Sequence, residues 1–424
     1  MSISNIKGLG NYAKDTSIYL CASLIPMILN LLINPLIAIN MSPYDYAIFG
    51  YFSSFSTLIS PIIVFYMLHY YTKSYYELTE KDRIKLKALL FKSLIFFSLI
   101  IALISFCLLL LYSSVINRSS EMPNFPYLWL MVFAIPLTGI YSLELTNYKM
   151  DKATISYFKL SLAVGLLLVC ANLIFVVVAK LGAVGKFLAP FVVNLLVFLF
   201  LLIKHRGLLK IKTPFTDFVK IIKFCYPLAL GAMLGYFTNG FDKTYLERLG
   251  DTESYGYYIV GSQIAGYLSV FSTAVYNTFQ PDVYEAVANK NNKKLLATCT
   301  LEFLMISGIV LIFILLCPIV IDLLTAGRYV DSTVFARIIS LSTITSTLYY
   351  LFNDVTIAKG FPKIYLYTSI FGSLIIVFLY PYITHIFSFK GGAYMVGASF
   401  LIFTILNIIF LLFAKSNHLK RLIS

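Results

Sequence analysis

Charged residues are scarce in this 424-residue chain: they make up 12% of it, about half of the roughly 25% that is usual in a soluble domain. No connector between its apolar segments is long enough to fold alone, so a separate soluble domain is not expected. Six cysteines are present, but they form no CxxC motif and no Cys/His cluster. We therefore expect neither a metal site nor a disulfide framework, and interpret the cysteines as small core residues.

Catalytic motifs are also missing. The sequence contains no pattern typical of a catalytic triad, a glycine-rich phosphate loop or an ATPase. We therefore expect no enzymatic activity and no cofactor.

Long hydrophobic runs are what the chain has instead. The first, Thr16 to Ile39, carries no charge over more than the ~20 residues that a spanning helix needs. A soluble domain lacks the surface to bury about twelve such helices, so we predict an all-α, polytopic membrane protein. The predicted spans are 16–40, 47–71, 88–112, 126–147, 153–179, 185–203, 222–246, 255–280, 295–319, 333–357, 364–386 and 393–413.

Basic residues set the orientation of these spans. Twenty-four Lys and Arg residues fall on the side that holds both termini, and six fall on the other side. Because loops rich in Lys and Arg stay in the cytoplasm, we predict that both termini are cytoplasmic. The formal net charge of +14 is thereby explained without a nucleic-acid partner.

An internal repeat divides the chain. With a shift of about 209 residues, Lys14 aligns with Lys223, and the connector 42–47 aligns with 251–256. Six spans return the chain to its starting side, so we predict two six-helix lobes of the same topology, 1–206 and 207–424. In transporters with parallel repeats, the substrate site lies between the halves.

Several connector motifs resemble those of a known family. Leu249 to Tyr258 (LGDTESYGYY) follows the pattern "leucine-glycine, a few polar residues, tyrosine-glycine", preceded by Phe241-Asp242-Lys243. The loops 180–185 and 390–393 resemble one another and lie before the last span of each lobe. With twelve spans in a 6+6 layout of the MATE type, the whole chain resembles the Wzx-type O-antigen flippases of the multidrug/oligosaccharidyl-lipid/polysaccharide exporter superfamily.

This resemblance implies a function and a location. Such proteins move undecaprenyl-pyrophosphate-linked oligosaccharide repeat units of O-antigen or related polysaccharides, used in lipopolysaccharide biosynthesis, across the bacterial inner membrane by alternating access. The implied partners are the lipid-linked oligosaccharide, membrane lipids, and a polysaccharide polymerase with its chain-length regulator. The glycan and the anionic pyrophosphate cannot cross hydrocarbon unaided, so we expect a polar, cationic cavity.

Four residues are candidates for that cavity. Ionisable residues within spans are costly and mark functional sites by default, which selects Lys159 and Arg337. Lys159 can equally extend to the membrane edge, and Arg337 can either bind pyrophosphate bidentately or anchor the interface. Asn30 and Asn34 share one helix face and either line the cavity or join helices by hydrogen bonds.

Five further residues are candidates for gating or ion coupling. Asp242 and Lys243 lie near the outward end of one span and form either a gate or a solvated helix end. Glu144, Asp354 and Glu302 lie toward the cytoplasm, where each can take a coupling proton; Glu144 or Asp354 can alternatively pair with Lys159.

Two other functions stay open. A multidrug or cation exporter of the same superfamily would favour an acidic cavity, but the first span has no acidic residue deep within it. A membrane polysaccharide polymerase would need a sizeable outward loop, and the longest here is about Ser113 to Phe125.

Overall fold

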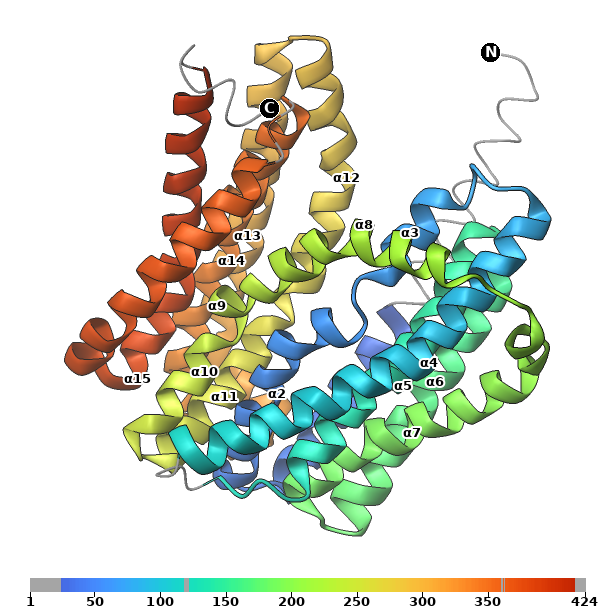
Figure 1. Cartoon of the computed structure of the whole chain (residues 1–424). Coiled ribbons are helices and arrows are strands. Elements are labelled where there is room, and N and C mark those ends of the chain that lie inside the picture. Colours follow the sequence, from blue (N-terminus) through green and yellow to red (C-terminus); the bar gives the residue numbers. More distant parts are fainter. Residues whose placement is uncertain (1–23, 118–121, 360, 362, 416–424) are drawn as a thin grey trace, which may run out of the picture. The chain divides into compact units, whose positions relative to one another are not determined.

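The computed structural model describes residues 24–117, 122–359, 361 and 363–415, which are almost wholly helical and contain no β-strand. Figure 1 shows long helices joined by short connectors. Ten of them are long and apolar enough to cross a membrane. Residues 16–23 of the first predicted span, and the predicted loop cations Lys7, Lys14, Arg118, Lys420 and Arg421, lie outside the described residues.

The chain divides into two compact units. Unit 1 comprises residues 1–42 and 58–233, and unit 2 comprises 43–57 and 234–424. The predicted lobe boundary at 206/207 stays a prediction.

The helices of unit 1 follow the predicted spans closely. They are Leu24–Asn40, the end of α2 (Pro43–Ile63), α3 (Met67–Ser74), α4 (Glu80–Leu111), η1 (Tyr112–Ile116), α5 (Tyr127–Met150), α6 (Thr154–Asn172), η2 (Leu173–Val178), α7 (Gly182–Lys204), η3 (Arg206–Lys210) and α8 (Phe215–Leu234) up to Met233.

Unit 2 begins with the first part of α2. Its other helices are α9 (Tyr236–Asn239), α10 (Phe241–Leu246), η4 (Glu247–Leu249), α11 (Thr252–Gly266), α12 (Leu268–Ala288), α13 (Asn292–Thr325), α14 (Ser332–Ala358) and α15 (Lys363–Lys415).

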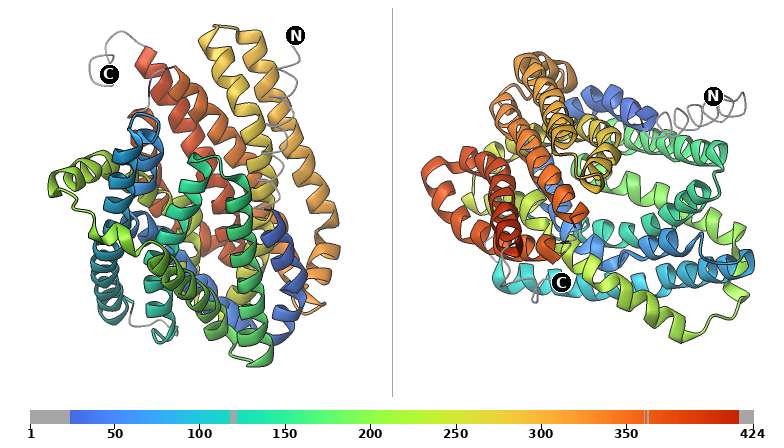
Figure 2. Two further views of the ribbon diagram at one scale, coloured as in Figure 1. Left: turned by 90° about the vertical axis from the view of Figure 1, so that its right-hand side faces the viewer. Right: turned by 90° about the horizontal axis from the view of Figure 1, so that it is seen from above.

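The last two predicted spans are the two arms of α15. A continuous helix of this length would be more than twice the ~30 Å hydrocarbon core, and the backbone leaves the helical region at Ser388. A Cβ on Gly372 would lie 2.8 Å from the Phe403 ring, so the arms pack side by side (Figure 2). The ten candidate spans become eleven when the two arms of α15 are counted separately. The shorter apolar helix Leu24–Asn40 brings the described residues to the predicted twelve.

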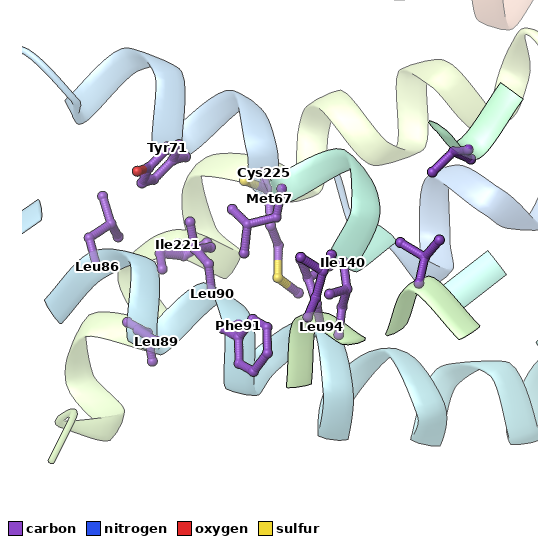
Figure 3. Packing of buried hydrophobic residues seen from close by; sticks show 14 of the residues in the cluster. Met67, Tyr71, Leu86, Leu89, Leu90, Phe91, Leu94, Ile140, Ile221 and Cys225 are labelled. Carbon is purple, nitrogen blue, oxygen red and sulfur yellow. The ribbon is translucent and has the colours of Figure 1, made fainter. Parts of the chain in front are cut away.

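A buried apolar cluster holds unit 1 together. Met67 of α3, Leu90 of α4, Ile140 of α5 and Ile221 of α8 are each at most 1% exposed and meet in one cluster (Figure 3). Because lipid tails are as apolar as these side chains, the cluster stabilises unit 1 through close packing and not through removal of apolar surface from water. This packing fixes the ends of α4, α5 and α7, which carry charged residues.

The motif at 249–258 has a structural role in unit 2. Gly250 has a φ of +75°, which glycine adopts without steric cost. The Asp251 carboxylate then caps α11 by accepting from the Ser254 amide at 3.0 Å, and hydrogen bonds from Ser254 lower the pKa of Asp251. A Cβ on Gly256 would lie 2.3 Å from the Pro43 carbonyl oxygen, so glycine permits α2 and α11 to approach closely.

Candidate functional site

A polar groove runs through unit 2 between helices that are otherwise largely apolar. It consists of two adjoining cavities, each of about 250 Å³, that share Ser272, Thr273, Ser346 and Tyr350. We call the two together the unit 2 groove. The first cavity is lined by Thr238, Asn239, Asp242, Lys243, Ser262, Ala265, Gly266, Ser269, Ile339, Ser342, Thr343, Val396 and Phe400 besides the shared residues, and the second by Tyr276, Asn277, Glu302, Ile306 and Thr347.

Helix periodicity places the hydroxyls of this groove. Ser269, Ser272 and Thr273 recur at spacings of three and four along α12, and Ser342 and Ser346 are four apart on α14, so each set shares a face. Ser and Thr are tolerated inside these helices because their hydroxyls can bond to the helix's own carbonyls. A hydrophilic wall therefore forms without breaking either helix.

Asp242 and Lys243 form one end of the groove. Asp242 of α10 is buried, accepts from the Tyr258 hydroxyl at 2.6 Å and lies 3.6 Å from the Lys243 ammonium. Lys243 also donates to the Asn239 carbonyl at 3.3 Å. A buried carboxylate with both a cation and a hydroxyl partner is compensated, and the partly exposed ammonium keeps further donors for a ligand.

Glu302 contributes the second charged group. It lies on α13, is 1% exposed, and neither carboxylate oxygen has a hydrogen-bond partner among the described residues. Asp354 of α14 is also buried and lies near enough to act on Glu302 electrostatically, and it accepts hydrogen bonds from Gln280 at 3.3 Å and from Tyr276. An isolated buried carboxylate is strongly unfavourable unless it gains a proton or a cation.

Glu144 lies in unit 1 and has three partners. This buried residue of α5 is 2.9 Å from Lys87 of α4, 2.8 Å from Lys204 of α7 and 3.0 Å from His205. The alternative pairing of Glu144 with Lys159 is therefore wrong. The pairing of Asp354, which lies in unit 2, with Lys159 stays a prediction. Glu144 joins three helix ends, an arrangement suited to holding them together.

The other unit 1 candidates lie apart from this cluster. Lys159 is exposed on α6 and makes no ion pair with any described residue. Asn30 is half-buried and donates to the Pro26 carbonyl of its own helix at 2.9 Å, whereas Asn34 is buried.

Arg337 occupies a structural position on α14. Its Nε donates to the Ile314 carbonyl of α13 at 3.1 Å. That carbonyl lacks its usual helical donor because Pro318, four residues on, has no backbone N–H. Arg337 thus satisfies an acceptor that the proline leaves free, and the rest of its exposed guanidinium stays available.

We expect the contributions of Arg337 and Pro318 to the free energy of unfolding to be coupled. Arg337→Ala should lower the free energy of unfolding by about 1.5–3 kcal/mol, the value of a hydrogen bond to a charged group. In a Pro318→Ala background, which restores the Ile314 donor, the same change should cost much less. Thermal unfolding of the four proteins in detergent measures the coupling. Equal losses in both backgrounds would contradict this role.

Sequence reasoning missed several of these groups. The hydroxyls of α12 and α14 were visible as a high density of Ser and Thr, above all in residues 340–347 (SLSTITST). His205, and the pairing of Lys87 and Lys204 with Glu144, depend on residues about 60 positions apart and left no local signal. Among the described residues, no group of three or more His, Cys, Asp or Glu is placed to hold a metal ion.

Comparisons with known proteins agree with this architecture. Residues 12–279 match the family described as "Polysaccharide biosynthesis protein", whereas no curated protein matches the chain. Solved structures with a similar fold include a multidrug resistance MATE family transporter of the MOP superfamily (TM-score 0.64, 14% identity, 94% of this chain and 97% of that one). The lipid II flippase MurJ is also similar (0.68, 16%, 92% and 86%).

A MOP superfamily transporter from Pyrococcus furiosus is similar as well (TM-score 0.57, 14% identity, 95% of both chains). At these identities the likeness shows the fold alone. The predicted polytopic helical fold is confirmed, and the chain is a multi-pass membrane protein whose fold is similar to that of these transporters.

Proposed function

We propose a function from one premise: this chain belongs to the polysaccharide biosynthesis protein family. It moves undecaprenyl-pyrophosphate-linked oligosaccharide repeat units, of O-antigen or a related polysaccharide, from one leaflet of the membrane to the other. The observation that carries this proposal is the unit 2 groove, a polar surface with a partly exposed ammonium inside a body of apolar helices.

The chemistry of the cargo supports this assignment. A polyprenyl tail can stay in lipid throughout, whereas a sugar that loses its water without new hydrogen bonds pays several kcal/mol per polar group. The groove offers hydroxyl, amide and charged groups to the sugar. Arg337 and Lys159 are the cations available to the pyrophosphate, and Asn30 and Asn34 are further polar contacts.

Glu302 and Asp354 are proposed as the coupling pair. One cation, a proton or Na⁺, binds to Glu302 when this residue is accessible from one side of the membrane. The cation leaves when Glu302 is accessible from the other side. Glu302 has no hydrogen-bond partner in the part of the chain that the structure describes, which supports this role. Asp242 and Lys243 form a gate in the same proposal.

The cellular setting follows from the orientation of the loops. We propose the bacterial inner membrane, with both termini cytoplasmic and the lobes 1–206 and 207–424 rocking in alternating access. A polysaccharide polymerase and its chain-length regulator would receive the product on the far side.

A cation exporter is the second candidate, because Glu302 is an acidic group in a cavity. Deleting the gene tests the two. Loss of surface polysaccharide, with single lipid-linked repeats accumulating on the inner leaflet, is the result that we expect for a flippase. Normal polysaccharide together with sensitivity to cationic drugs would favour the exporter.

A further inference from the structure

We propose that the unit 2 groove binds the glycan of the cargo through the glycan's own hydrogen-bond donors, while the pyrophosphate binds elsewhere. This inference rests on the proposed function and adds which part of the cargo the groove takes. It follows from the direction of the hydrogen bonds that the lining residues already make.

Five hydroxyls of the groove have already used their hydrogens. Thr238 bonds to the Gly235 carbonyl at 2.9 Å, Ser269 to Gly266 at 2.6 Å, and Thr273 to Ser269 at 2.6 Å. Ser272 and Ser346 bond to carbonyls in the same way, at 3.1 and 3.0 Å. Because a carbonyl cannot donate, each of these hydroxyls must be the donor, and only its oxygen lone pairs remain for a ligand.

An amide and a carboxylate add to this pattern. The Asn239 nitrogen donates to the Gly235 carbonyl at 3.1 Å and to the Thr238 hydroxyl at 2.8 Å, so the side chain presents its oxygen. Glu302 lines the adjoining cavity, and its two buried oxygens are acceptors without a hydrogen-bond partner among the described residues. The groove therefore presents many acceptors, and Lys243 is the charged donor at one end.

Such a surface discriminates between the parts of the cargo. Phosphate oxygens are acceptors and carry negative charge, so a wall of lone pairs repels them. Sugar hydroxyls can turn their hydrogens toward the wall, and an N-acetyl group supplies an N–H. The groove thus favours the glycan, and aromatic Tyr350 and Phe400 in the lining give its apolar faces a surface to contact.

Thr273 is the residue that best tests the inference, because it lines both cavities. Thr273→Val keeps the shape and removes the acceptor. Thr278→Val is its matched control: Thr278 is also exposed on α12 and also bonds to a carbonyl of its own helix, at 2.9 Å, but it does not line the groove.

Binding to purified protein in lipid nanodiscs separates the parts of the cargo. The probes are the lipid-linked saccharide extracted from the producing cells, the same lipid with its sugar hydroxyls O-methylated, and undecaprenyl pyrophosphate alone. We expect wild type to prefer the sugar-bearing lipid over the other two. Thr273→Val should bind the sugar-bearing lipid about 3- to 10-fold more weakly, the value of one hydrogen bond. Its affinity for undecaprenyl pyrophosphate should be unchanged. Thr278→Val should bind all three lipids as wild type does.

Two results would overturn the inference. In the first, wild type binds the lipid-linked saccharide and its O-methylated form with equal affinity, which would show that the groove does not recognise the sugar's hydrogen-bond donors. The proposed function would stand in that case, because both lipids still bind. A Thr273→Val variant that binds the sugar-bearing lipid as tightly as wild type would show that this acceptor does not contact the glycan. Failure of wild type to bind any of the three lipids would instead count against the proposed function.

Discussion

Glu144→Ala is expected to lower the free energy of unfolding by about 3 kcal/mol, the lower end of the range for breaking a buried ion pair. The carboxylate is 3% exposed and lies within 3.0 Å of two lysines and a histidine. Its removal leaves Lys87 and Lys204 without their counter-charge. The lower end of the range applies because Lys204 is 37% exposed and can reach water.

Thermal unfolding in detergent, followed by size-exclusion chromatography, measures this loss. Asp217→Ala is the matched control, since Asp217 also pairs with a lysine in unit 1, but both partners are largely exposed. Exposed ion pairs contribute little to stability, so the control should have a melting temperature close to that of wild type. Equal melting temperatures for the two variants would show that the Glu144 cluster does not hold the ends of α4, α5 and α7 together.

Glu302→Gln is expected to separate stability from transport. The amide has nearly the same shape but carries no charge, so the cost of an unpaired buried carboxylate disappears. We therefore expect a melting temperature equal to or above that of wild type. Transport driven by an imposed pH or Na⁺ gradient should fall at least 10-fold, because the coupling charge has no binding group.

Glu285→Gln controls for the loss of a charge in unit 2. Glu285 lies on α12, is exposed and pairs with Lys294 at 2.8 Å, and its replacement should leave gradient-driven transport intact. Imposing the pH and Na⁺ gradients separately identifies the ion. A Glu302→Gln variant that still responds fully to both gradients would remove Glu302 from the coupling site.

The helices could be predicted closely because hydropathy reports contact with lipid. The predicted spans 185–203 and 333–357 match α7 and α14 to within a few residues. The prediction for α4 started at residue 88, whereas the helix begins at Glu80. The first turns of α4 contain Glu80, Asp82 and several lysines. This part of the helix is polar, so hydropathy, which detects only apolar segments, does not reveal it.

Breaks within the spans could not be predicted in the same way. The span 47–71 is interrupted between α2 and α3, where Phe65 and Tyr66 have positive φ, a conformation that no local residue preference indicates. The span 222–246 is divided near Gly235 and Gly240 into α8, α9 and α10. Hydropathy averages over such breaks because an interrupted helix is as apolar as a continuous one.

The site was predicted residue by residue but not as an arrangement. Glu302 and Asp354 were recognised because charge inside a span is costly, and the structure places them near one another. Their spacing of about fifty residues gave no sign of this. Arg337 was selected for its charge, yet its Nε contact depends on Pro318 of a neighbouring helix, which only the packing of α13 on α14 reveals.

Movement of a lipid-linked oligosaccharide across a membrane is the most direct test of the account. Purified protein is reconstituted into liposomes that contain the extracted lipid-linked saccharide with a fluorescent label on its sugar, and a membrane-impermeant quencher is added outside. We expect wild-type protein to expose nearly all of the label over time, whereas protein-free liposomes expose about half. Equal quenching with and without protein, in liposomes where the protein does export a cationic dye, would contradict it.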